Sequence, residues 1–207
     1  MSLGSSGSTL AGVIATAGGV TDAAGQAKIA LLANALCQWI VDEASALPTG
    51  PVALQTIGTA VGVGGSIVFP GADGNDLGDA VANAMSVPLT DVEGRNRWRL
   101  FGTALVDHIE DSAEIKGTGP SEAMVANPAG GPVLGLGGLQ FGSVIYFPPI
   151  SSQMLMTGPN IVPWDAIGVA ILFHIAAFAE VGIVAGGANG FNSPAGGGTL
   201  GGVSFIK

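Results

Sequence analysis

Residues 97–120 read RWRLFGTALVDHIEDSAEIKGTGP, and apolar side chains recur in them at the spacing of one helix face. The opposite face is mostly acidic, which predicts an amphipathic helix with its charged face in water. A cation followed by a glycine is typical of a helix C-terminus, so we expect this helix to end near Lys116 and Gly117. The positions on the apolar face are Trp98, Phe101, Gly102, Leu105, Val106, Ile109 and Ala113.

The same pattern occurs twice more in the chain. Residues 28–51 match residues 97–120 at nine of 24 positions without a gap, at an offset of 69. Residues 164–185 match residues 98–119 at seven positions, at an offset of 66. Self-similarity at a nearly fixed spacing is typical of internal repeats. The apolar faces are Ile29, Leu32, Ala33, Leu36, Cys37, Ile40 and Ala44 in the first helix, and Trp164, Ile167, Gly168, Ile171, Leu172, Ile175 and Ala179 in the third.

Each expected helix is followed by a glycine- and proline-rich connector and then by a short apolar run. The runs are GSIVFP at 65–70, GSVIYFP at 142–148 and, less closely, GVSFI at 202–206. Such β-branched and aromatic runs between Gly and Pro predict short strands, antiparallel or at sheet edges. We therefore predict an α+β fold, in which three related helix, Gly/Pro-rich connector and short strand units pack around a shared core with much irregular loop.

The repeat sets the expected boundaries. Each unit is too small to bury a core alone, so we expect one compact domain overall. We expect the first helix to start near Thr21 and Asp22, and the short linker helix to be capped by Asn75 or Asp76. The segments are a flexible N-terminal arm and lead-in at 1–27, unit 1 at 28–73, a linker with a short helix at 74–96, unit 2 at 97–148, a linker at 149–163, and unit 3 at 164–207.

The third helix is apolar on both faces, which predicts burial in the centre of the fold or in a subunit contact. Residues 181–206 carry no charge, and strand edges without charges favour pairing with a neighbouring chain. We therefore expect a homo-oligomer. The interface residues we predict are Phe173, Phe178, Val169, Phe191, Phe205 and Ile206.

Composition excludes several classes of protein. Charged residues make up 10% of the chain and hydrophobic residues 48%, which is the opposite of a disordered chain. Six Lys and Arg against 15 Asp and Glu argue against nucleic-acid binding. Mean hydropathy is +0.55, but glycines and prolines interrupt every long uncharged stretch, so we predict no membrane span. The first residues lack the basic and apolar regions of a secretory signal.

Few residues suggest chemistry. His108 and His174 occupy equivalent repeat positions, with Trp39 as the third, but zinc needs three or four ligands, so hydrogen-bonded helix histidines are favoured over a metal site. Cys37 aligns with core positions and is expected to be a buried thiol, with a nucleophile or an intermolecular disulfide as alternatives. Residues 73–79 are similar to a calcium loop but place Leu77 at a ligand position, which favours a turn into a helix.

No catalytic motif stands out. The glycine-rich stretches at 62–65 and 135–138 fit no nucleotide-binding fingerprint, and no G-x-S-x-G elbow is present. The acidic pairs at 42–43 and 110–111 lie on polar helix faces and are expected to be solvated. We therefore predict no catalytic, cofactor-binding or metal-binding residues, and a protein that is not an enzyme.

The alanine-rich helices at 104–119 and 170–187, each with a downstream Gly/Pro tract and strand, resemble small structural proteins of tailed bacteriophage virions. The resemblance implies a virion component assembled in the host cytoplasm: a capsid decoration or cement protein that binds other virion proteins through apolar loops and strand edges, or a neck, tail or baseplate part. Three related units suggest a place on a local threefold axis. The other alternative is a bacterial enzyme or ligand-binding domain with glycine-rich loops.

Overall fold

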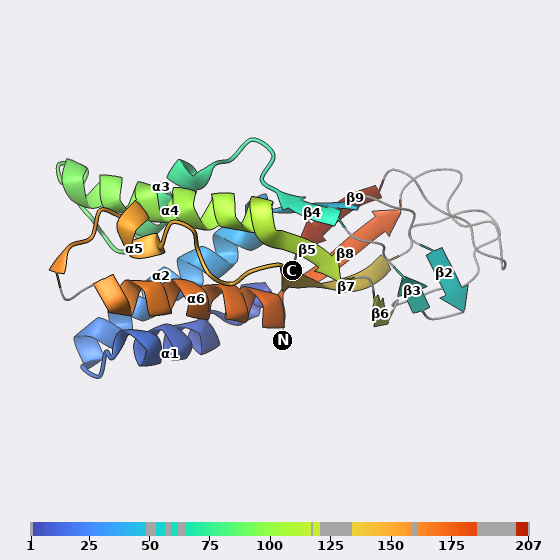
Figure 1. The fold of residues 1–207 in the computed structure, drawn as a ribbon, viewed down its shortest axis with the longest axis horizontal. Helices are drawn as coiled ribbons and strands as arrows, with labels where there is room; N and C mark the ends of the chain where they lie inside the picture. The colour runs from blue at the N-terminus through green and yellow to red at the C-terminus, as the bar shows by residue number, and fades with distance from the viewer. Residues whose placement is uncertain are drawn as a thin grey trace.

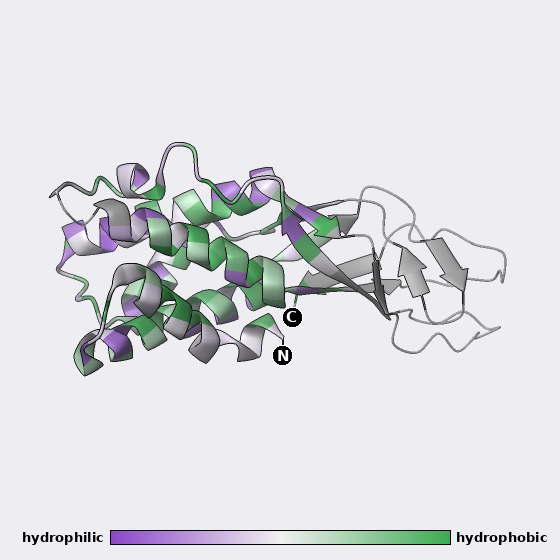
Figure 2. Ribbon diagram, turned by 60° about the horizontal axis from the view of Figure 1, so that its bottom comes forward, coloured by the Kyte–Doolittle hydropathy of each residue, from purple (hydrophilic) through white to green (hydrophobic). Residues whose placement is uncertain are grey.

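Helices form one end of the molecule and strands extend towards the other (Figure 1). The computed structural model describes residues 2–48, 53–56, 59–61, 65–116, 118–120, 134–158, 161–185 and 202–206. Hydrophobic residues run along the helices, with hydrophilic residues between them (Figure 2). The predicted α+β class is confirmed.

The α-helices of the described part alternate between short and long. The short ones are α1 (Gly7–Gly18), α3 (Gly74–Ala84) and α5 (Ile150–Gln153), and the long ones are α2 (Ala23–Glu43), α4 (Val92–Ser112) and α6 (Ile161–Phe178). A 3₁₀ helix, η1 (Leu3–Ser5), precedes α1. Each helix contacts the next one along the chain, and α6 contacts α1. The helices therefore form a closed ring in chain order.

Each long helix leads directly into a strand that then pairs with a later, returning strand. The pairs are β1 (Ser45–Pro48) with β4 (Gly65–Val68), β5 (Ala113–Lys116) with β7 (Leu134–Phe141), and β8 (Glu180–Ala185) with β9 (Gly202–Ile206). A separate sheet has the order β2 (Ala53–Thr56), β3 (Thr59–Val61) and β6 (Thr118–Pro120). All strand pairs in the described residues are antiparallel, as the sequence predicted.

The three hairpins also lie in a ring. β7 pairs with β8, which joins the second and third hairpins into one sheet. β4 contacts β5, and β1 contacts β9, so the first hairpin lies between the two edges of that sheet. Side chains that face inward fill the interior of such a small ring. Each hairpin supplies one directly opposed, buried pair: Ala46 with Ile67, Ile115 with Leu139, and Val181 with Ile206.

The long helices end in the same way. The amide of Ala44 donates to the carbonyl of Ile40, and Ala113 donates to Ile109 in the same manner. Ala179 repeats this bond with Ile175. The predicted apolar faces are buried except for their first residues, which are partly exposed. The predicted start of the first helix is confirmed, since Asp22 caps α2. A rotational relation between the three units stays a prediction.

Two predicted elements were wrong around the second unit. α4 ends at Ser112 rather than near Lys116, because Ala113 and Ile115 are buried on either side of exposed Glu114, which is strand periodicity. The predicted strand at 142–148 is an irregular segment. The returning strand is β7 instead, which includes the glycine-rich stretch 135–138 that we expected to be loop.

The flexible arm predicted for residues 1–27 is also wrong. η1 and α1 form there, and Leu3, Leu10 and Ile14 are buried. Leu10 and Ile14 are four residues apart and share the helix face that meets α2 and α6. The burial of these side chains stabilises the ordered N-terminal segment. No helix in the described residues has the length and apolar character needed to cross a membrane.

Candidate functional site

Ser6, Cys37 and His174 form a buried polar cluster between the N-terminal segment, α2 and α6. Ser6 Oγ lies 2.7 Å from the carbonyl of Leu3, 2.7 Å from His174 Nε2 and 3.9 Å from Cys37 Sγ. Ser6 is fully buried and His174 is 4% exposed. Burial lowers the pKa of His174 and raises the pKa of the Cys37 thiol, so both side chains are held neutral.

The hydrogen bonding of this cluster argues against a serine nucleophile. A serine hydroxyl has one proton, and Ser6 donates it to the carbonyl of Leu3. His174 therefore donates from Nε2 to Ser6 Oγ instead of accepting the serine proton as a general base would. The thiol of Cys37 is buried and protonated, as the sequence predicted, and so is a poor nucleophile. The cluster joins the N-terminal segment to α6.

His108 lies in a different environment. Its Nε2 is 2.8 Å from the carbonyl of Ser143, which can only accept, so this nitrogen carries a proton. Its ring packs on Tyr146 with centroids 4.5 Å apart. At the equivalent positions, Trp39 stacks on Phe69 at 5.1 Å and His174 packs on Phe178 at 4.5 Å. These three positions thus hold ring contacts, and no group of three or more His, Cys, Asp or Glu in the described residues is arranged to hold a metal ion.

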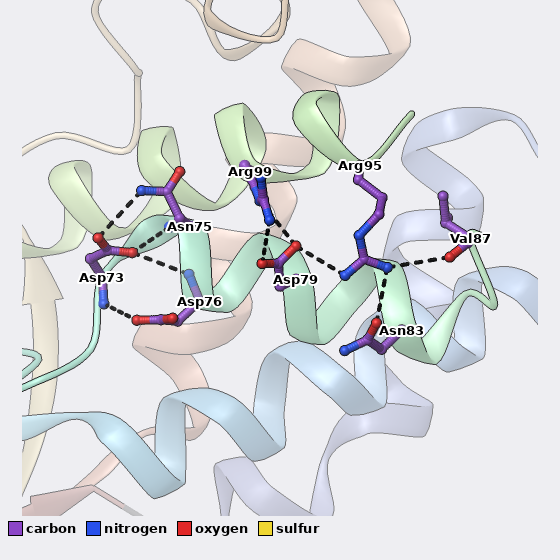
Figure 3. A network of polar contacts seen from close by, with 8 residues as sticks. All are labelled: Asp73, Asn75, Asp76, Asp79, Asn83, Val87, Arg95 and Arg99. Atoms are coloured by element: carbon purple, nitrogen blue, oxygen red, sulfur yellow. Dashed lines mark hydrogen bonds and ion pairs between the residues drawn. The ribbon is translucent and has the colours of Figure 1, made fainter. Parts of the chain in front are cut away.

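The segment similar to a calcium loop is a helix cap. Asp73 Oδ1 accepts from the amides of Asn75 at 2.7 Å and Asp76 at 3.1 Å, and Asp76 Oδ2 accepts from the amide of Asp73 at 3.0 Å (Figure 3). The hydrogen bond from the Asp76 amide, followed by those from the side chain and amide of Asn75, lowers the pKa of Asp73. The cap is therefore Asp73, two or three residues earlier than predicted, and its carboxylate oxygens already accept hydrogen bonds from the helix.

A charged network joins α3 to α4. Asp79 accepts from Arg99 Nε at 3.0 Å and Nη2 at 2.8 Å, and from Arg95 Nη2 at 3.1 Å (Figure 3). Arg95 also donates to Asn83 Oδ1 at 3.0 Å and to the carbonyl of Val87 at 3.3 Å. The hydrogen bond from Arg99, followed by its charge, lowers the pKa of Asp79. The charges and hydrogen-bonding groups of this network are paired with one another between α3 and α4, so the network has a structural role.

The predicted interface residues fall in different places. Phe173 is 58% exposed on α6, so that helix is not buried all round within the chain. Val169 and Phe178 are partly buried. Ile206 was wrongly predicted, because it is 1% exposed and fills the strand ring opposite Val181. Phe191 lies outside the described residues, and of Phe205 the structure describes only the backbone, in β9.

The most exposed apolar side chains include two on the irregular segment after β7. Phe147 is 97% exposed and Ile145 71%, while Tyr146 between them is 3% exposed and donates to the carbonyl of Gly168 at 3.3 Å. We call residues 143–149 the Phe147 segment; it contains no charged residue. It is held over α4 and α6 through one set of side chains and presents the alternate set to solvent. The lack of charged residues in this segment is a sequence signal for an exposed apolar surface. The sequence pattern instead predicted a strand at these residues.

No known protein family, curated protein or solved structure matches this chain.

Proposed function

We propose that the chain is a non-enzymatic structural protein of a tailed bacteriophage virion, and specifically a capsid decoration or cement protein. The observation that carries the proposal is the closed ring in which helices and hairpins follow one another in chain order. Three hairpins, each with one buried cross-strand pair, lie in this ring, which is the arrangement expected of a chain with three similar sectors.

Such a chain fits a place where three copies of another subunit meet. Closed assemblies contain rotation axes, and a binding protein on a threefold axis meets the same surface three times. One chain with three similar sectors meets all three copies at once, and its linked contacts gain avidity. Neck, tail and baseplate parts are alternatives within the same class of particle.

The polar groups support a structural role. Buried Ser6 and His174, exposed Asp73 and partly buried Asp79 are engaged in caps and links between helices. Exposed apolar side chains such as Phe147 and Phe173 supply binding surface.

The test is purification of particles from the strain that carries this gene, followed by quantitative mass spectrometry and imaging. We expect the protein to co-purify in fixed stoichiometry with the shell, with its density on a threefold or local threefold axis. Its absence from intact particles would refute the proposal. Density away from any such axis, on the neck, tail or baseplate, would replace the decoration role with one of the alternatives.

A further inference from the structure

The charges of α4 are distributed against the helix dipole. Arg95, Arg97 and Arg99 lie in its N-terminal half, whereas Asp107, Glu110 and Asp111 lie at its C-terminal end, where a helix favours cations. The ion pairs found among the described residues all involve the three arginines. The acidic end of α4, which we define as Asp107, Glu110, Asp111 and the following Glu114, is exposed and has no ion pair within the described side chains.

Repulsion within this acidic end acts on Asp107. Asp107 and Asp111 are four residues apart on one helix, a spacing at which like charges destabilise each other. Partial burial, and then the charge of Asp111, raise the pKa of Asp107. Among the described residues, the partners of Glu110 and Glu114 are neutral: the amide of Phe69 and the side chain of Gln140. A cation from another molecule would relieve this repulsion.

The Phe147 segment lies against this acidic end. Ser143 accepts a hydrogen bond from His108, which directly follows Asp107 in α4, and the Tyr146 ring packs on the same histidine. The exposed side chains of Ile145 and Phe147 are therefore on a segment that contacts α4 within its acidic end. Large apolar side chains beside unpaired charges of one sign are typical of a surface that another protein covers.

We propose that Ile145, Phe147 and the acidic end of α4 form a docking surface for a different protein, whose own surface has an apolar pocket rimmed by Lys or Arg. A second copy of this chain fits poorly, because the chain carries a net charge of −9 and a twofold contact would bring the same carboxylates together. The inference rests on the proposed function, since it names the chemistry of the virion partner.

The test uses the full chain and a defined probe, a fluorescent helical peptide with leucines on one face and lysines on the other. A second peptide carries glutamate in place of each lysine. In fluorescence anisotropy we expect binding of the lysine peptide only, weaker at about 300 mM than at about 50 mM salt because screening shortens the range of the charges. The double variant I145S/F147S is expected to weaken binding about tenfold, as for an aromatic hot spot. D107N/D111N is expected to weaken it several-fold and to reduce the salt dependence.

Two matched controls carry the same chemical changes elsewhere. L89S/V92S removes exposed apolar side chains near the start of α4, and D42N/E43Q removes the acidic pair at the end of α2. Both are expected to bind as the unchanged protein does. Equal losses in the controls, or no loss in I145S/F147S, would overturn the proposal. So would a dimer in sedimentation experiments that I145S/F147S abolishes, because the surface would then bind a second copy.

The peptide experiment and the particle experiment test the docking surface and the virion assignment independently. If the protein is absent from particles but binds the lysine peptide through Ile145 and Phe147, the docking surface stands and the virion assignment falls. If the protein is found in particles but its peptide binding does not depend on these residues, the docking surface falls alone. The altered side chains are exposed, apart from partly buried Glu43, so the variants are expected to unfold at the same temperature as the unchanged protein. This measurement excludes misfolding as the cause of any loss of binding.

Discussion

Gly102 of α4 lies where this helix crosses α3 at two other glycines. A Cβ at Gly102 would meet the backbone of Gly74 and Gly78, and a Cβ at Gly78 would meet the backbone of Arg99. Backbone atoms cannot turn aside as a flexible side chain does. The close approach of α3 and α4 therefore depends on the absence of side chains at these three positions.

We expect Gly102→Ala to lower the free energy of unfolding by about 2–3 kcal/mol, because the added methyl group forces the two helices apart. Gly12→Ala is the matched control, since a Cβ at this helical position meets nothing within 4 Å. It should stabilise the protein by about 0.5–1 kcal/mol through helix propensity. Urea unfolding measures both. Equal effects of the two substitutions would contradict the role of Gly102.

The buried histidine predicts a dependence of stability on pH. Burial lowers the pKa of His174, so the unfolded chain, with a histidine pKa near 6.5, takes up a proton at a higher pH than the folded chain does. The contribution of neutral His174 is therefore fully present above about pH 6.5 and is lost progressively as the pH falls below it. Unfolding by urea between about pH 5.5 and 7.5 should show this loss.

His174→Gln is expected to flatten that pH profile, because glutamine can still donate to Ser6 but does not titrate. If H174Q retained the full slope, another group would be responsible for the pH dependence.

At the scale of elements, the cap of α3 can be tested with a pair of substitutions. Asp73→Ala removes the acceptor for two backbone amides and should lower the unfolding midpoint by about 2–4 °C. Asp73→Asn keeps a cap oxygen and should cost less. The lowered pKa of Asp73 means that its ionised form contributes above a pH of about 3.9 and that this contribution is lost as the pH falls. In circular dichroism melts, the difference between the unchanged protein and D73N should therefore be smaller at pH 3 than at pH 7.

The elements differ in how far the sequence predicted them. The long helices were predictable because their buried positions, such as Leu105 and Ile109, repeat at helical spacing over several turns. The end of α4 was not, because β5 has only four residues and its alternation continues the helix pattern for one more turn. β7 was missed because its glycines carry no side-chain signal, and backbone pairing with two neighbours stabilises it.

The candidate site was predictable only in part. The sequence pointed to Phe173, which is exposed, but also to Ile206, whose burial depends on its pairing with Val181 across two distant strands. Ser6 had no signal, because its partner His174 is 168 residues away. The exposure of Phe147 likewise depends on the anchoring of Tyr146 to α6, a contact that sequence spacing does not reveal.

At the scale of the whole molecule, the offsets of 69 and 66 link Ala46, Ile115 and Val181, and the structure places all three inside the strand ring. β9 supplies Ile206, which pairs with Val181 inside the ring. β9 lies between β8 and β1. The ring predicts that β9 supports both neighbours rather than β8 alone.

Deletion of residues 202–207 should therefore destabilise the whole chain by more than Ile206→Ala does, for which we expect about 2–5 kcal/mol. Removal of Lys207 alone is the control and should have little effect. Urea unfolding followed by tryptophan fluorescence reports on all three, because Trp39, Trp98 and Trp164 lie in the helices. A deletion that unfolds at the same midpoint as the full chain would contradict a closed ring.

The contacts of α1 with α6 and of β1 with β9 also bear on synthesis of the protein. A chain emerges from the ribosome from its N-terminus, so the first two thirds of this one are made before either partner exists. Until α6 and β9 emerge, the nascent chain leaves one side of α1 and one edge of β1 uncovered. The final strand thus completes the earliest ones, and a ribosome stalled before residue 202 would hold a protein that a chaperone binds.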